Sequence, residues 1–387
     1  MAAYNDKKYR NVFSEIGKSD AEIEKKIKDA VDTFFYGSEE ERIFHPVGDD
    51  MGYLEDTGNH DARTEGMSYG MMMCVQLDMK EEFDRIWKWS KTYMWMNEGE
   101  NEGYFAWSCN VDGSKNSNGP APDGEEFYAM ALFFASHRWG DGEGIFNYSA
   151  EAKEILRACV HKGENGRAGA PMWNRDNHLV LFVPGHPFSD PSYHLPHFYE
   201  LFAEWAYEED KEFWQTAAKE SRKYLVKTCH PVTGLNPEYG NFDGSPVNDP
   251  MPWDGSVHGR FFSDAYRTAA NIGLDAEWFG KDEGQISVPL KMMKFFGTDI
   301  EAMRCVYEID GTSLELPVLH PVGLLATMAQ SALSVPYSKE SGSDFEIASK
   351  WVEWFWNQPL RQGKRRYYDN CLYLFALLAL SGNYRIW

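Results

Sequence analysis

A glutamate at the expected boundary between a loop and a helix is the first residue whose surroundings suit acid–base chemistry. Glu65 lies in the run RTEGMSYG at 63–70, where a helical pattern begins. A carboxylate in a first helical turn commonly does no more than complement the helix dipole. At the rim of a cleft, shielded by Met67 and Tyr69, the same carboxyl would have a raised pKa and would protonate a leaving oxygen.

Two further aspartates stand at similar boundaries. Asp123 precedes a long apolar helical run, where it either caps the helix or holds a sugar hydroxyl through a carboxylate hydrogen bond. Asp264 and Arg267 are three residues apart, which is the spacing of an ordinary ion pair on one helix face. The alternative interpretation is a carboxylate base that the nearby cation keeps ionised.

The composition favours an uncharged polyol as the ligand. Aromatic residues make up 15% of the 387 residues, with 14 Trp and 21 Tyr, and flat Trp and Tyr faces stack well on sugar rings. Trp107 and Trp173 are our candidates for stacking, with core packing as the alternative for each. The net charge of −22 repels phosphate backbones, so we expect no nucleic-acid partner.

The six cysteines form neither a CxxC pair nor a short cluster with histidine. We therefore expect no metal site, no cofactor and reduced thiols in the core. No run of about 18 apolar residues is present, so we expect no membrane partner. The chain begins MAAYNDKK without an apolar signal segment, which favours a cytoplasmic location. A monomer is the simplest expectation for the oligomeric state.

Helical periodicity dominates the chain and predicts an all-α protein. A capping box at Ser19–Glu22 opens the first of these helices, and Gly37 is expected to end it. The predicted helices are 21–36, 66–78, 81–96, 124–139, 149–162, 194–208, 211–228, 263–273, 286–297, 322–333, 344–357 and 369–380.

About twelve helices without a Pro- or Ser-rich linker indicate one domain over residues 1–387. A barrel of six inner and six outer helices is the economical closure, with inner helices that are apolar on most sides. Three long loops, 97–123, 163–192 and 230–262, should gather at one end and form a cleft. The best extended segment is HLVLFVP at 178–184, within a loop hairpin.

Three stretches resemble, in order, the motifs of glycoside hydrolase family 8. The run TEGMSYGM from Thr64 resembles the acid motif of the family, which has Ser at the first position. The run SDAYR from Ser263 resembles the base motif, which begins with Tyr. The run from Ala121 to Trp139 resembles the family signature and departs from it at Pro122, Glu125 and Tyr128.

This resemblance extends from about residue 45 to the YYDN segment at 367–370. It implies an (α/α)6 barrel that hydrolyses β-1,4 glycosidic bonds with inversion. Carried over by position, Glu65 is the general acid and Asp264 the general base. Asp123 would bind the sugar at the cleavage point and help to order the water, and Arg267 would orient the carboxylates.

Within the family the chain is similar to the members that release xylose from the reducing end of xylooligosaccharides. The supporting runs are PMWNRDN at 171–177, DPSYHLPH at 190–197 and LHP at 319–321. In that group the LHP loop closes one side of the cleft. The resemblance implies that His320 reads the terminal hydroxyl of the last xylose and that Tyr193 forms a hydrogen bond near the catalytic water.

Two alternatives stay open. An endo-acting β-1,4-xylanase or glucanase of the same family would need a cleft open on both sides of the cut. A non-catalytic oligosaccharide-binding protein on the same helical ring is disfavoured, because all three carboxylates are present.

Overall fold

Helix boundaries follow local signals that the sequence carries. In the computed structural model, which describes residues 2–297, 300–336 and 342–387, the Ser19–Glu22 capping box is formed and opens α3 (Asp20–Tyr36). Gly37 occupies the C-cap of this helix. Each of the twelve predicted segments is helical in the structure. Their bounds differ from the predicted ones by a few residues, mainly because 3-10 or π turns occupy some ends.

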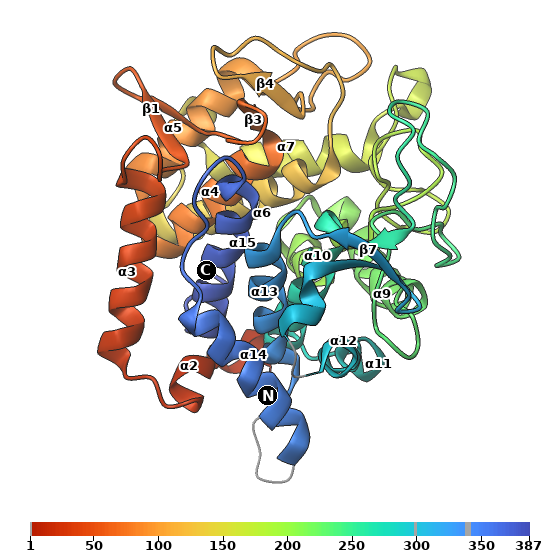
Figure 1. Cartoon of the computed structure of the whole chain (residues 1–387). Coiled ribbons are helices and arrows are strands. Elements are labelled where there is room, and N and C mark those ends of the chain that lie inside the picture. Colours follow the sequence, from red (N-terminus) through yellow and green to blue (C-terminus); the bar gives the residue numbers. More distant parts are fainter. Residues whose placement is uncertain (1, 298–299, 337–341) are drawn as a thin grey trace.

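Six inner helices form a closed ring (Figure 1). Each inner helix contacts the next one in chain order, and the last contacts the first. In the described part of the chain they are α4 (Thr64–Leu77), α6 (Pro122–Trp139), α8 (Pro196–Trp205), α10 (Tyr266–Trp278), α13 (Pro321–Gln330) and α15 (Arg366–Leu380). One outer helix precedes each of them, namely α3, α5 (Lys80–Trp89), α7 (Tyr148–His161), α9 (Lys211–Thr228), α12 (Val288–Phe296) and α14 (Gly342–Asn357). The predicted (α/α)6 barrel is confirmed.

Burial distinguishes the two layers, as their sequences predict. All of α15 is buried, and α4 is buried at every position except Glu65 and Leu77, because inner helices contact both neighbours and the outer layer. The outer helix α9 buries one face only. Three short helices complete the set: α1 (Ala3–Asp6), α2 (Val12–Glu15) and α11 (Glu283–Ile286).

Within the described residues the strands form three small antiparallel sheets that the sequence did not reveal. They pair β1 (Phe44–Val47) with β2 (Met51–Leu54), β3 (Asp61–Arg63) with β4 (Ser108–Asn110), and β5 (Arg260–Phe261) with β6 (Cys305–Glu308) and β7 (Ser313–Pro317). The sheets position the site, because β3 runs directly into α4 and β5 ends just before Asp264.

The predicted segment at 178–184 lies in a loop hairpin, as expected, because Asn174 and Leu181 donate backbone hydrogen bonds to the carbonyls of Leu179 and Met172, but it is not a continuous strand. Only a single antiparallel bridge between Trp173 and Val180 is formed. His178 has a φ of 59°, which is a left-handed conformation that interrupts an extended chain.

The cysteines are unpaired, as expected: all six are free thiols, and only Cys305 is partly exposed. None of the helices in the described ranges combines the length and the apolar composition that a bilayer crossing requires.

A close approach between α10 and the turn after α13 depends on Gly273. A methyl group on Gly273 would lie 2.8 Å from the carbonyl oxygen of Gln330 and from the Cα of Ser331, and backbone atoms cannot rotate away. Gly273→Ala should therefore lower the free energy of unfolding by about 1–3 kcal/mol, as overpacking does. Urea denaturation followed by circular dichroism measures this change.

Gly284 provides the matched control, because it is an exposed helical glycine whose added methyl group would meet only side chains, the nearest at 3.2 Å. Gly284→Ala should leave the stability unchanged or raise it slightly. An equal loss in the two variants would contradict this account of the α10 packing.

Candidate active site

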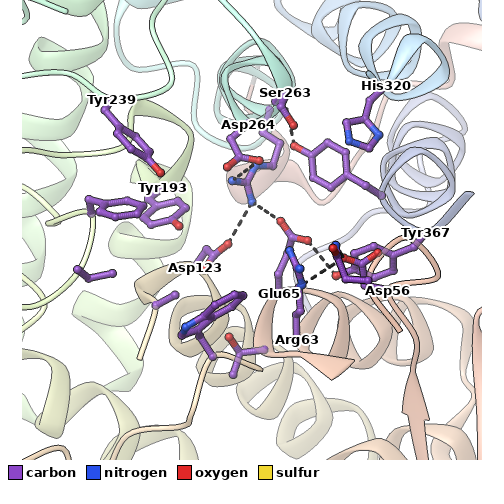
Figure 2. A pocket seen from close by; sticks show the side chains of 18 of the residues that line it. Asp56, Arg63, Glu65, Asp123, Tyr193, Tyr239, Ser263, Asp264, His320 and Tyr367 are labelled. Atoms are coloured by element: carbon purple, nitrogen blue, oxygen red, sulfur yellow. Dashed lines mark hydrogen bonds and ion pairs between the residues drawn. The ribbon is translucent and has the colours of Figure 1, made fainter. Parts of the chain in front are cut away.

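The N-terminal ends of the inner helices converge on one cleft of about 730 Å³ (Figure 2). Each of these ends provides a lining residue at or just before its first turn: Glu65 (α4), Asp123 (α6), Tyr193 (before α8), Asp264 (before α10), His320 (α13) and Tyr367 (α15). Because helix N-termini carry partial positive charge, this arrangement favours carboxylates in the cleft.

Arg267 lies at the centre of the acidic residues. Its Nη1 is 3.1 Å from Glu65 Oε2 and 3.2 Å from Asp123 Oδ2. Its Nη2 is 3.5 Å from Asp264 Oδ1, so the predicted ion pair between Asp264 and Arg267 is present. Nη1 also donates a hydrogen bond to the hydroxyl of Tyr69 at 2.7 Å. One buried guanidinium thus brings together all three carboxylates that the sequence singled out.

Burial raises the pKa of Glu65 to about 7. The carboxylates of Asp123 and Asp264 raise this pKa further, whereas Arg267 and a hydrogen bond from Tyr367 lower it. Tyr367 donates that bond to Oε1 at 2.9 Å. Glu65 is therefore a carboxyl of the cleft that can hold a proton near neutral pH.

Met67 is fully buried and is not among the residues that line the cleft. Its sulfur accepts a hydrogen bond from the backbone N–H of Leu54. The hydroxyl of Tyr69 accepts a hydrogen bond from Arg267, which in turn contacts Glu65, whereas Tyr367 contacts the Glu65 carboxyl directly.

The two aspartates have different surroundings. Asp123 is buried, which raises its pKa, while Arg267 and the N–H of Gly124 lower it. Ala121 occupies the N-cap of α6, so the alternative role of Asp123 as the cap is excluded. The side chain of Asp264 is 35% exposed and sits on the turn Ser263–Ala265 at the start of α10. It is the most solvent-accessible of the three carboxylates.

His320 and Tyr193 line the cleft, as predicted (Figure 2). His320 Nδ1 lies 2.8 Å from the buried carboxylate of Asp369, and its ring packs edge-on against Tyr368. A proton on Nδ1 makes Nε2 an acceptor. Tyr193 lies on the turn before α8, with its ring 5.5 Å from the guanidinium of Arg267.

The two tryptophans predicted to stack on sugar rings have different surroundings: Trp107 lines the cleft, and Trp173 is buried. Trp107 lines the cleft, is 38% exposed and lies 5.2 Å from the guanidinium of Arg63. Trp173 is 1% exposed and packs edge-on against Tyr199 and Trp214. No sugar ring can reach Trp173, so its assignment as a stacking residue is corrected.

An aromatic wall formed by Phe182, Tyr239 and Trp253 lines the cleft and was not predicted residue by residue. Phe182 contacts Tyr239 with ring centroids 4.3 Å apart and stacks on Trp253 at 5.9 Å. Figure 2 shows Tyr239 and Tyr193 across the cleft from His320 and Tyr367. Phe182, Tyr239 and Trp253 come from loops 163–192 and 230–262, whose predicted role in forming the cleft is confirmed.

Tyr367 and Tyr368 were also missed as site residues, although the YYDN segment marked their position in the sequence. Within the ranges that the structure describes, no three His, Cys, Asp or Glu side chains are grouped as metal ligands are.

The hydrogen bond from Tyr367 leads to a prediction about the protonation of Glu65. Because this bond stabilises the ionised form, Tyr367→Phe should raise the pKa of Glu65 above its native value of about 7. The carboxyl is then protonated up to a higher pH than in the native protein. Carbon-13 NMR of glutamate-labelled protein measures the midpoint, with Glu65→Gln used to assign the signal.

Tyr373→Phe is the matched control, because the hydroxyl of Tyr373 bonds to the Gln358 carbonyl outside the cleft. It should leave the midpoint of Glu65 unchanged. A midpoint near 4.5 in the native protein would show that burial does not act on this carboxyl as described.

Comparison with known proteins places this site in a family. The sequence model of glycosyl hydrolases family 8 matches residues 50–381. A reducing end xylose-releasing exo-oligoxylanase of Halalkalibacterium halodurans is 56% identical over 389 aligned residues, covering 100% of this chain and 96% of that protein. The exo-oligoxylanase Rex8A of Paenibacillus barcinonensis is 54% identical, with 100% and 98% covered.

The solved structure of Rex8A complexed with xylose superimposes with a TM-score of 0.95 and covers 100% of this chain and 99% of that one. A match of the family model over most of the chain, with relatives above 50% identity along its full length, leaves one conclusion: the chain belongs to glycosyl hydrolase family 8.

Proposed function

We propose that this protein hydrolyses β-1,4-xylosidic bonds in xylooligosaccharides with inversion and releases xylose from the reducing end. The observation that carries the proposal is a cleft in which a protonatable glutamate with a 17% exposed side chain and a more accessible aspartate share one arginine, with His320 on one side. The relatives that match the chain over its full length are named for this activity.

Glu65 is the general acid. Its pKa of about 7 keeps it protonated at neutral and lower pH, and its proton passes to the glycosidic oxygen as the bond from that oxygen to the anomeric carbon breaks. Above this pH the acid is ionised, so the rate should fall as the pH rises.

Asp264 is the general base. It accepts a proton from a water molecule whose oxygen forms the new bond to the anomeric carbon, on the face opposite the leaving group. Inverting enzymes need about 6.5–9.5 Å between the two carboxyls to admit this water. Glu65 and Asp264 bind different nitrogen atoms of the Arg267 guanidinium.

Asp123 and Tyr193 bind the sugar at the cleavage point. Asp123 has one oxygen on Arg267 and the other on the N–H of Gly124, so its position is fixed before a substrate arrives. Tyr193 lies beside the same guanidinium, where its hydroxyl can help to order the water.

His320 recognises the reducing end. Because Asp369 fixes the ring through Nδ1, Nε2 is presented as an acceptor for the terminal hydroxyl of the last xylose. The rest of the oligosaccharide extends toward the aromatic wall of Phe182, Tyr239 and Trp253 and toward Trp107, where flat rings provide stacking surfaces.

We further propose that residues 1–387 act as one catalytic domain, since the helices of the ring run from Asp20 to Leu380. A cytoplasmic location and a monomeric state stay predictions.

The exo specificity is tested with xylotetraose labelled at the reducing end. The first labelled product should be free xylose, and the viscosity of long xylan should stay constant. His320→Ala should reduce the preference for a free reducing end over a reduced alditol end by about 10-fold, the effect of losing one hydrogen bond to a buried partner. Native enzyme that cuts xylotriitol as fast as xylotriose would refute the role of His320.

The acid and base assignments are tested by stereochemistry and by isosteric variants. Proton NMR of the first product should show the anomer opposite to that of the cleaved bond. Glu65→Gln should reduce turnover by about 10²–10⁴-fold and leave xylotriose binding intact, because only the proton donor is lost. Retention of the anomeric configuration would exclude Asp264 as the base, and unimpaired hydrolysis by Glu65→Gln would exclude the acid.

A further inference from the structure

The turn that carries Asp264 is strained and is held from two sides. Ser263 has a φ of 33°, a conformation that residues other than glycine rarely adopt. On one side, the hydroxyl of Tyr368 donates a hydrogen bond to the carbonyl of Ser263 at 3.3 Å. On the other side, the backbone N–H of Asp264 donates to the carboxylate of Glu238. A strained turn persists only when its surroundings hold it, so these two hydrogen bonds help to fix the orientation of Asp264.

Glu238 lies behind the cleft and does not line it. The residue is 4% exposed, and its Oε2 is 2.8 Å from His258 Nδ1. Its backbone N–H donates to the carbonyl of Arg260, the first residue of β5, which is the strand leading into the Asp264 turn. A buried carboxylate is costly unless it is hydrogen-bonded, and this one has two partners, His258 and the N–H of Asp264.

His258 is itself fixed by contacts on its other nitrogen and on its ring face. Its Nε2 is 2.6 Å from the hydroxyl of Ser256, which donates to the carboxylate of Asp254 at 2.6 Å. The ring of Tyr239, a residue of the aromatic wall, stacks on the imidazole at 4.2 Å. A continuous set of hydrogen bonds therefore runs from Asp254 on the surface to the backbone of Asp264.

We propose that Glu238 is a positioning residue for the reaction: its carboxylate anchors the Asp264 N–H, and His258 holds that carboxylate in place. The inference rests on the proposed function, in which Asp264 is the base.

The need for such an anchor follows from the weak restraint on the Asp264 side chain. That side chain is 35% exposed, and its ion pair with Arg267 is long, at 3.5 Å. The carboxylate must nevertheless meet a water molecule at a defined place, and a displacement of about 1 Å can reduce the rate by about 100-fold. Burial raises the pKa of Glu238 to about 7, whereas the hydrogen bonds from His258 and from the Asp264 N–H lower it. The bond to the Asp264 N–H therefore favours the ionised carboxylate, which is a stronger acceptor than the neutral acid.

Glu238→Gln tests the proposal with little change in shape. The glutamine side chain has one acceptor oxygen in place of two, so it cannot accept hydrogen bonds from His258 and from the Asp264 N–H as the carboxylate does. For xylotriose hydrolysis we expect kcat to fall by about 10- to 100-fold. KM should stay within about twofold of the native value, as should the calorimetric affinity for xylotriose when Glu238→Gln is added to Glu65→Gln.

Asp210→Asn is the matched control. Asp210 is also a buried carboxylate bonded to a histidine, with His161 Nε2 at 2.5 Å, but it lies between α7 and α9, outside the cleft. This variant should lose a comparable amount of thermal stability and keep the native kcat. An equal fall of kcat in the two variants would overturn the proposal, because destabilisation alone would then explain it.

A double variant separates this inference from the function on which it rests. If Glu238 acts through the base, adding Glu238→Gln to Asp264→Asn should lower the residual rate by less than about twofold. A native kcat in Glu238→Gln, with Asp264→Asn inactive, would overturn the positioning role alone. Full activity of Asp264→Asn would overturn the base assignment and this inference with it.

Discussion

A single buried guanidinium holds the catalytic end of this barrel together. Arg267 is 4% exposed and contacts three carboxylates that lie at or just before the N-terminal ends of three different inner helices. Burying a cation is costly unless charges and hydrogen bonds compensate it, and here the carboxylates and the hydroxyl of Tyr69 do so. Without the cation, three carboxylates would face one another across the cleft with no charge to offset their repulsion.

The ring architecture makes this concentration of acids possible. Because inner and outer helices alternate along the chain, every inner helix points its N-terminus toward the same end of the ring. The positive ends of six helix dipoles then surround the carboxylates. The outer layer keeps most of each inner helix away from solvent.

Differences in burial allow neighbouring carboxyls to have different roles. Glu65 is enclosed by Tyr367 and Arg267, and burial raises its pKa to about 7. Asp264 stands on a turn with about a third of its side chain exposed, next to the same cation. In the proposed reaction, this contrast separates a proton donor from a proton acceptor although both contact one arginine. Glu238 would complete the arrangement by holding the backbone of the acceptor rather than by touching the substrate.

The long loops give the cleft its shape. Loops that carry Trp107, Phe182, Tyr239 and Trp253 rise from the same end of the ring and present flat rings to the cleft. His320 faces them from the start of α13, anchored by the buried Asp369. The same scaffold thus carries the carboxylates at the starts of helices and the aromatic rings on the loops above them.

The sequence by itself determined the helices and the identity of the acidic residues, because these depend on near neighbours. Periodicity located the twelve helices, the Ser19–Glu22 box opened the first as expected, and local motifs identified Glu65, Asp123 and Asp264. Only the tertiary structure decided what surrounds each side chain. Arg267 meets Glu65 across 202 residues and Tyr367 meets it across 302, while Trp173, with the same local aromatic signal as Trp107, is buried. Burial, pKa and access to a ligand arise from such distant contacts, which local patterns do not encode.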